Sequence, residues 1–405
     1  MKHDSKLFSG LKFIYICRKP SHIGIMLRHL GRGGADIRSD RIHLRAVMDW
    51  LCKAQDATGC GGVSAGYNLA RGWKPPFPET TGYIIRTFVQ CSSALQDDSY
   101  LDRAIRMGDW EIEIQLPSGA VRGGVGINEY PVIFETGQVI LGWISLYEET
   151  NRDEYLQAAS RAADWLVGIQ DDDGKWSQHA FEGVPHAYHS RVAWSLLEVY
   201  RCTGEEKYKH AARKNVLWTL SLAGENGWFR QAGFTTDEVP LAHTIAYTLR
   251  GLLESSSYLE DEQRESIGRI VRTASENIIE RHGLSEDEAS CESRAFLPAF
   301  LNDRWTSDVS FTCPVGNIQL AIIWLKLHES RHEVRYSKAA LRLIDQVKGM
   351  QSLNSRNPGI RGGIPGSYPI GGGYITYGYP NWAAKFFADA LMLKTKIGQP
   401  PGDEG

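Results

Sequence analysis

The pattern of apolar and polar positions along the chain predicts helices. Apolar residues recur at helical spacing between Leu156 and Ile169, and again over Val192–Tyr200 before Thr203-Gly204 ends the run. Recurrence every three to four residues places side chains on one face of a helix. Gly-rich segments separate these runs, and only short extended pieces inside the segments indicate strands. The pattern therefore predicts an all-α chain.

A fixed spacing of Tyr, Trp and Gln repeats along the chain. Tyr precedes Trp by ten residues in three places, and Gln follows Trp by five residues in three places. The Trp markers are Trp50, Trp110, Trp165 and Trp218, each assigned to an outer helix. The fifth unit has a weaker marker near Asn277, and in the sixth unit Gln346 takes the place of Trp. Together these make six units over residues 40–396. A repeat of this kind decides the fold before any other feature does.

Six helical hairpins of nearly constant length predict a closed (α/α)6 toroid. An open array would need capping repeats at its ends, and the sequence indicates none. In a closed ring the second helix of each pair lines the centre, and the Gly-rich loop before it faces a shared funnel. The predicted organisation is a basic N-terminal arm at 1–40, the toroid at 41–396 and a disordered tail at 397–405.

Charge is spread unevenly along the chain. Residues 1–45 hold ten Lys and Arg against three Asp and Glu, a net charge of +7. Because the whole chain has a net charge of −3, the remaining residues have a net charge of −10. This arm is interpreted as solvated and loosely ordered, with contact to nucleic acid or peripheral contact to an anionic membrane as the alternatives. The apolar run Leu11–Cys17 is too short to span a bilayer and has no signal-peptidase site. Seven Cys without a CxxC pair favour reduced thiols, and the expected location is cytoplasmic.

The starts of the six predicted inner helices carry ionisable and polar side chains. Helix N-termini favour anionic groups, so these positions are candidates for chemistry on a charged substrate. The alternatives are helix capping for the acids and a hydrogen-bonded core position for each His. The candidate catalytic residues are Glu79, Glu135, His189, Arg191, His243, Tyr247 and Tyr379.

Aromatic and basic residues recur in the Gly-rich loops and at the helix starts. Aromatic rings stack on the apolar faces of sugars, and Arg binds carboxylates with two parallel hydrogen bonds. The alternative for the aromatic residues is packing within the loops. The candidate substrate-binding residues are Tyr67, Arg122, Gln138, Trp176, Tyr188, Trp228, Arg230, Asn317, Gln319, Tyr377, Asn381 and Lys385.

The sequence gives little support for a cofactor. His179, His186 and His189 lie close in sequence, but no Cys or acid joins them at an established zinc spacing. The Gly clusters lack the surroundings of a phosphate-binding or dinucleotide-binding loop, and no GxSxG elbow occurs. We therefore expect an enzyme with no metal and no cofactor, whose partner is a sugar and not a nucleic acid.

Residues Arg161–Trp176 resemble the QW repeat of triterpene cyclases. The match consists of an aromatic-aliphatic pair, Gln170, Gly174 and Trp176, and only this unit matches in full. The Asp-x-Asp-Asp acid motif of those cyclases is absent, because Asp171-Asp172-Asp173 is followed by Gly. A cyclase-like activity is therefore the least favoured alternative.

A closer resemblance covers nearly all of residues 40–396. The motifs that carry it are Pro78-Glu-Thr-Thr-Gly-Tyr83, Phe134-Glu-Thr-Gly-Gln138, Ala187-Tyr-His-Ser-Arg191, Ala242-His-Thr-Ile-Ala-Tyr247 and Tyr379-Pro-Asn-Trp-Ala-Ala-Lys-Phe-Phe-Ala388. They resemble toroid proteins of bacterial exopolysaccharide clusters, and more distantly the helical domains of glucuronyl C5-epimerases and polysaccharide lyases. The resemblance implies carbohydrate chemistry in polysaccharide assembly or turnover.

The favoured hypothesis is an enzyme that removes the proton next to the carboxylate of a uronate, followed by β-elimination or epimerisation. His189 or His243 is the expected base, Tyr247 or Tyr379 the acid, and Arg191 with Asn317 or Asn381 the carboxylate-binding group. Glycoside hydrolysis by Glu79 and Glu135 is one alternative. A toroid that binds a glycan or holds a synthesis complex together without catalysis is another.

Overall fold

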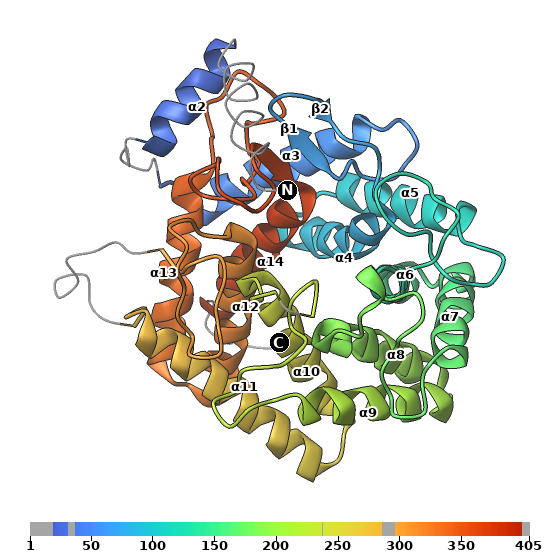
Figure 1. Cartoon of the computed structure of the whole chain (residues 1–405). Coiled ribbons are helices and arrows are strands. Elements are labelled where there is room, and N and C mark those ends of the chain that lie inside the picture. The colour runs from blue at the N-terminus through green and yellow to red at the C-terminus, as the bar shows by residue number, and fades with distance from the viewer. Residues whose placement is uncertain (1–18, 31–36, 237, 286–295, 399–405) are drawn as a thin grey trace, which may run out of the picture.

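The twelve helices α3 to α14 form two concentric rings in the computed structural model, which describes residues 19–30, 37–236, 238–285 and 296–398 (Figure 1). The prediction of an (α/α)6 toroid is confirmed. The inner helices are α4 (Pro78–Leu95), α6 (Ile133–Thr150), α8 (Ser190–Thr203), α10 (Ala242–Ser255), α12 (Pro314–Arg331) and α14 (Asn381–Gly398). The outer helices are α3 (Asp40–Asp56), α5 (Ser99–Glu113), α7 (Asp153–Gly168), α9 (Glu206–Ser221), α11 (Asp261–Arg281) and α13 (Val334–Met350).

Each inner helix packs along the outer helix that follows it in sequence, and α14 packs on α3. The closely packed hairpins therefore run from inner to outer helix, whereas the sequence pattern paired each outer helix with the next inner one. A left-handed residue ends four of the inner helices and turns the chain sharply outward. These residues are Gln96, Asn151, Gly204 and His332, with φ between 54° and 73°. Because the last inner helix packs on the first outer helix, the ring closes.

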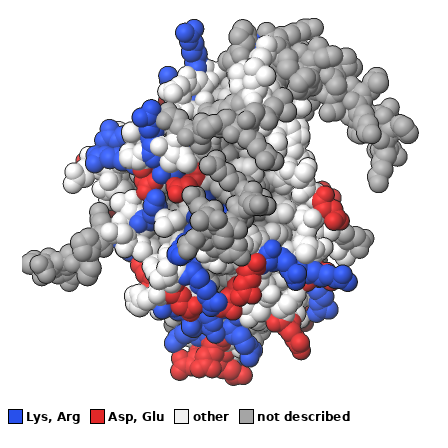
Figure 2. All heavy atoms as spheres, turned by 90° about the vertical axis from the view of Figure 1, so that its left-hand side faces the viewer, with Lys and Arg blue, Asp and Glu red and all other residues white. Residues whose placement is uncertain are grey.

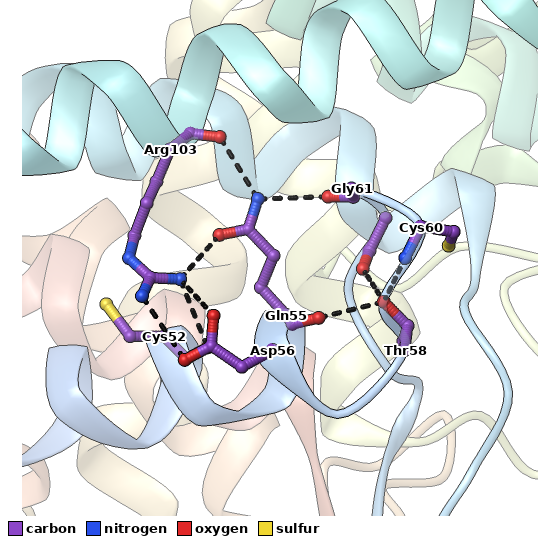
Figure 3. Close-up of polar contacts among 8 residues, drawn as sticks. Cys52, Gln55, Asp56, Thr58, Cys60, Gly61 and Arg103 are labelled. Atoms are coloured by element: carbon purple, nitrogen blue, oxygen red, sulfur yellow. Dashed lines mark hydrogen bonds and ion pairs between the residues drawn. The ribbon is translucent and has the colours of Figure 1, made fainter.

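Gln55 shows what the repeated Gln does (Figure 3). Its side-chain Nε2 donates to the carbonyl of Gly61 at 2.9 Å and to the carbonyl of Arg103 at 3.1 Å. Gly61 belongs to the Gly-rich turn of the same unit, and Arg103 lies on the outer helix of the next unit. Arg103 returns a bond to Gln55 Oε1 and pairs with Asp56. One amide thus ties a loop to the neighbouring helix.

The same contact recurs around the ring. Gln115 binds the carbonyls of Gly119 and Ala158, and Gln170 binds those of Gly174 and Ala211. The repeated Tyr also joins units, because its hydroxyl donates to the acid just before the marker position of the preceding outer helix. These pairs are Tyr155–Asp109, Tyr208–Asp164 and Tyr336–Glu276. The Tyr and Gln residues that recur at these spacings therefore make hydrogen bonds between neighbouring units.

Replacement of Gln351 by Ala should destabilise the ring at its closure. Gln351 Nε2 donates to Gly362 O at 2.7 Å and His43 O at 3.4 Å, and its Oε1 bonds to His43 Nδ1. Loss of these buried bonds removes one hydrogen-bond partner from Gly362 O and one from the His43 ring, at a cost of about 2 kcal/mol in the free energy of unfolding. Urea unfolding measures this change. The exposed Gln157→Ala is the control, and equal stability of the two variants would contradict the role of Gln351.

Short strands and single turns shape the loops above the inner helices. Strands β1 (Gly66–Asn68), β2 (Gly72–Trp73) and β3 (Gly378–Pro380) form an antiparallel sheet in the order β2-β1-β3. Tyr67 pairs with Trp73 on one side and with Tyr379 on the other. The sheet therefore joins the first loop of the ring to the last one. Two short 3-10 helices, η1 (Phe181–Gly183) and η2 (Ala187–His189), lie in the loop before α8. A third, η3 (Ser256–Tyr258), directly follows the end of α10.

The N-terminal arm differs from its expected form. Residues Pro20–Leu30 form helix α2, in which His22, Ile25, Met26 and His29 are buried. The backbone N–H of Ile370 donates to His29 Nδ1 at 3.0 Å, so α2 packs on the last Gly-rich loop. The expectation of a solvated arm is thus wrong for these eleven residues.

The remaining expectations about the termini lie mostly outside the described residues. Residues 1–18, 31–36 and 399–405 are not described, and α14 includes residues 397–398 of the expected tail. In the described ranges, every helix is too short or too polar to cross a lipid bilayer.

Candidate active site

Three ionisable residues occupy the same position in three inner helices. Glu79, Arg191 and His243 are each the second residue of their helix, after Pro78, Ser190 and Ala242. Pro fits the first turn of a helix because it has no N–H to leave unpaired. The shared position directs the three side chains into the centre of the ring. There burial raises the pKa of Glu79 and lowers that of His243, and the charge of Arg191 opposes the first shift and adds to the second.

Arg191 is a buried cation that uses an amide as its hydrogen-bond partner. Its Nε donates to Gln138 Oε1 at 2.9 Å, and its guanidinium lies 4.9 Å from the centre of the Tyr247 ring. Among the described residues no carboxylate forms an ion pair with it, and burial lowers its pKa to about 10. A guanidinium at this pKa is charged at neutral pH. A buried charge without a counter-ion is costly, and a bound anion would offset that cost.

Glu79 lies beside this cation, and Glu135 lies beside Glu79. Burial raises the pKa of Glu79 to about 8, although Arg191 opposes the shift. Burial also raises the pKa of Glu135, and the charge of Glu79 raises it further. The backbone N–H of Gly124 donates to both Glu135 oxygens, at 2.8 and 3.0 Å, which opposes the rise. Glu79 is therefore mostly protonated at pH 7 and able to give up a proton.

His243 is held in its neutral form. Burial lowers its pKa to about 3, and the charge of Arg191 adds to the effect. Its Nδ1 lies 2.6 Å from the Gln319 side-chain amide. Its ring is centred 4.3 Å from that of Tyr247 and 5.8 Å from that of Tyr374. Neutral imidazole can accept a proton, but a pKa this low makes it a weak base.

Aromatic rings surround the group, and three of them are not among the candidate residues given above. Tyr83, Tyr374 and Phe386 lie around Tyr247 and Arg191, with the Phe386 ring 5.9 Å from Tyr247. Burial raises the pKa of both Tyr83 and Tyr374, so each keeps its hydroxyl proton. A signal for Tyr83 was present in the sequence, because it follows Glu79 by four residues and shares its helix face. Tyr188 stacks on His186, with the ring centres 4.4 Å apart.

His189 and Trp176 lie away from this group. His189 is fully buried, and neither ring nitrogen has a hydrogen-bond partner among the described residues. Burial holds its pKa well below the usual value. The Trp176 ring is also fully buried, and its Nε1 donates to the Leu166 carbonyl at 2.9 Å. The full burial of both rings counts against the expectations that His189 is a base and that Trp176 stacks on a sugar, which stay predictions.

Four further candidates hold loops and helices in place. Asn317 bonds to Thr312, and Asn381 donates to Ser64 O and Thr80 Oγ1. Both Asn side chains are fully buried. Lys385 pairs with Asp389, and burial lowers its pKa to about 8.

Arg122 stays within its own loop. It donates to the Ile114 and Asn128 carbonyls and pairs with Glu129. Like Asn317 and Lys385, it has polar partners within the protein, whereas the buried Oδ1 of Asn381 has none among the described residues. These residues build the surroundings of the site.

The remaining candidates lie in the loops above the ring. Tyr379 is 2% exposed in β3 and Tyr377 is 8% exposed just before it, so both mainly pack. Tyr67 accepts a bond from Asn357 at 3.1 Å and retains partial exposure. Trp228 and Arg230 line a separate groove of about 420 Å³ near Asp303. The structure thus gathers Glu79, Glu135, Gln138, Arg191, His243, Tyr247 and Gln319 into one group. The other candidates lie outside it.

Two kinds of known protein resemble this chain. The family model of the squalene-hopene cyclase C-terminal domain matches residues 73–253, which is less than half of the chain. Comparison with curated protein sequences gives no match.

Solved structures give the second likeness. An unsaturated glucuronyl hydrolase specific for heparin shares 15% identity at a TM-score of 0.66, covering 88% of this chain and 96% of that one. The cellobiose 2-epimerase of Bacillus thermoamylovorans shares 12% sequence identity at a TM-score of 0.65, covering 87% of this chain and 97% of that one. A sugar epimerase from a ruminal bacterium shares 12% sequence identity at a TM-score of 0.67, covering 89% of this chain and 99% of that one. These structural neighbours are carbohydrate-active toroid enzymes, and at this identity the likeness shows the fold.

Proposed function

We propose that the protein is a carbohydrate-active enzyme that acts on an acidic, uronate-containing oligo- or polysaccharide. The observation that carries this proposal is the buried Arg191, which has no carboxylate partner in the described part of the chain, beside Glu79 with a pKa of about 8. The cation suits the carboxylate of the substrate, and the protonated acid suits a leaving oxygen. Polysaccharide assembly or turnover, in the cytoplasm and within an exopolysaccharide system, remains the proposed context.

Hydrolysis is the reaction that these groups favour. Glu79 would give its proton to the bridging oxygen as that bond breaks, and Glu135 would accept a proton from the attacking water. The second role requires ionised Glu135. The bonds from the Gly124 N–H favour that form, but burial and the charge of Glu79 still hold the pKa of Glu135 well above its usual value. The complete burial of His189 counts against one of the two bases on which proton abstraction from carbon depends. Hydrolysis by Glu79 and Glu135 is therefore favoured over proton abstraction from carbon.

Proton abstraction by His243 is the second candidate. The neutral imidazole bonded to Gln319 and the nearby Arg191 are the base and the carboxylate-binding group that elimination or epimerisation needs. The pKa of about 3 counts against it, because the base would be weak.

Labelled water separates the reactions. We expect a uronate oligosaccharide panel incubated in ¹⁸O water to give products one water heavier, with ¹⁸O at the new reducing end. Unsaturated uronates, or deuterium at a sugar carbon without cleavage in heavy water, would assign the reaction to His243 instead. The variant His243→Asn should then lose that activity. Tight binding of a glycan with no turnover would overturn the claim of catalysis and leave a binding toroid.

A further inference from the structure

Helix α2 has apolar side chains on two opposite faces. Ile25 and Met26 are buried against the body of the protein, while Ile23 is 41% exposed and Leu27 is 63% exposed. Ile23 and Leu27 are four residues apart and therefore lie on the same side of the helix. The inner face is fixed by hydrogen bonds from the last loop to His22 and His29. The helix thus holds its outer apolar face toward solvent at a defined place.

Exposed apolar side chains are frequent in this part of the chain. Eleven large apolar residues are exposed in the described parts of the chain, and four of them, Ile23, Leu27, Ile37 and Ile42, fall between residues 23 and 42. Ile23 and Leu27 share one face of α2, and we call this pair the α2 patch. Single exposed apolar residues are ordinary on protein surfaces, whereas a group of them marks an interaction site.

The charge near the patch is positive. Lys19, Arg41 and Arg45 are exposed in the same stretch of chain. The acid among them, Asp40, is bound by Lys348 and Lys394, so it does not offset their charge. Figure 2 faces the side of the molecule on which α2 lies; several Lys and Arg side chains lie at its upper left, and others lie among Asp and Glu in its lower half. Residues 1–45 as a whole carry the surplus of positive charge described above.

We propose that the α2 patch and its flanking basic residues bind the surface of a membrane that contains anionic lipids. Apolar side chains on one helix face enter the boundary between head groups and acyl chains, and nearby Lys and Arg bind lipid phosphates. A protein partner would be expected to provide acids for these cations, while a lipid surface supplies both apolar and anionic groups at once. The surface is independent of the central group of ionisable residues, so the proposal does not rest on the proposed reaction.

Co-sedimentation with vesicles tests the proposal on the full chain. The probes are vesicles of phosphatidylcholine alone and of phosphatidylcholine with an equal amount of phosphatidylglycerol. We expect binding to the anionic vesicles that weakens in high salt, and little binding to the neutral ones. Equal binding to both kinds of vesicle, or none to either, would overturn the proposal.

Variants distinguish the patch from other surfaces. The double change Ile23→Ser and Leu27→Ser should weaken vesicle binding about tenfold or more, and Arg41→Glu with Arg45→Glu should do the same. Matched controls are the exposed Val334→Ser and the pair Arg269→Glu with Arg331→Glu, which should bind as the parent does. Thermal melting verifies that each variant is folded.

Self-association is the main rival outcome. If Ile23→Ser and Leu27→Ser dissociate a dimer seen by light scattering and leave vesicle binding unchanged, the patch is an interface between copies and the membrane proposal is wrong. Loss of vesicle binding in a monomeric protein supports the proposal.

Discussion

Replacement of Glu79 by Gln is expected to lower turnover of an acidic oligosaccharide by about 10²–10⁴-fold, the range typical of a lost general acid. The amide keeps the size of the side chain but has no proton to give to the leaving oxygen. Because burial keeps the carboxyl mostly protonated at pH 7, the neutral amide should leave the fold intact. Steady-state kinetics should show the loss in kcat, with KM nearly unchanged.

The pH profile gives the same residue a second signature. The protonated form of Glu79 disappears as pH rises through about 8, so kcat of the parent enzyme should fall there. Stability should change in the same direction, because the folded-state pKa of about 8 exceeds the ordinary value of 4.5. The contribution of protonated Glu79 to the free energy of unfolding is complete below pH 4.5 and is lost as pH rises through about 8. The variant Glu79→Gln should show a smaller fall in unfolding free energy over this window.

Glu129→Gln is the matched control for this variant. Glu129 is 90% exposed and pairs with Arg122 in a loop, so its replacement should change neither kcat nor its pH profile. Full activity of Glu79→Gln would remove the acid role and leave His243→Asn as the decisive variant. Equal losses in the Glu79 and Glu129 variants would mean that the assay responds to charge in general.

The closed ring could be predicted because its contacts repeat in the sequence. Trp50 and Trp110 mark outer helices, and Gln55 and Gln115 bind the next outer helix in the same way. Each contact is made at a fixed distance along the chain from its marker. Equal geometry around a ring requires equal spacing, so a sequence pattern is sufficient to reveal the fold.

The centre of the ring was only partly predictable, because the exact first residue of each helix matters there. The sequence motifs aligned His189 with His243, but the position equivalent to His243 is Arg191. A shift of two residues turns a side chain by about 200° around a helix axis. His189 therefore lies in the short turn before α8 and is sealed beside Trp176, while Arg191 reaches the centre. Spacing alone does not fix a helix start to within two residues.

Close packing of the inner helices is a further feature that spacing does not reveal. A Cβ atom added at Gly142 would lie 2.1 Å from the carbonyl oxygen of Gly82 on the neighbouring helix. One added at Gly82 would lie 2.5 Å from the Val139 Cα. The two glycines therefore let α4 and α6 approach until their backbones touch. This approach sets the separation of the helices that carry Glu79 and Glu135.

Replacement of Gly142 by Ala should consequently destabilise the protein by about 3 kcal/mol, since the new methyl group meets fixed backbone that must move. It should also reduce turnover, because separation of α4 from α6 moves Glu79 relative to Glu135. The control is Gly168→Ala at the end of α7, where an added Cβ has no atom within 4 Å. Urea unfolding and kinetics of both variants test the prediction together. If Gly142→Ala is as stable and active as Gly168→Ala, close contact between these two helices does not position the carboxyl pair.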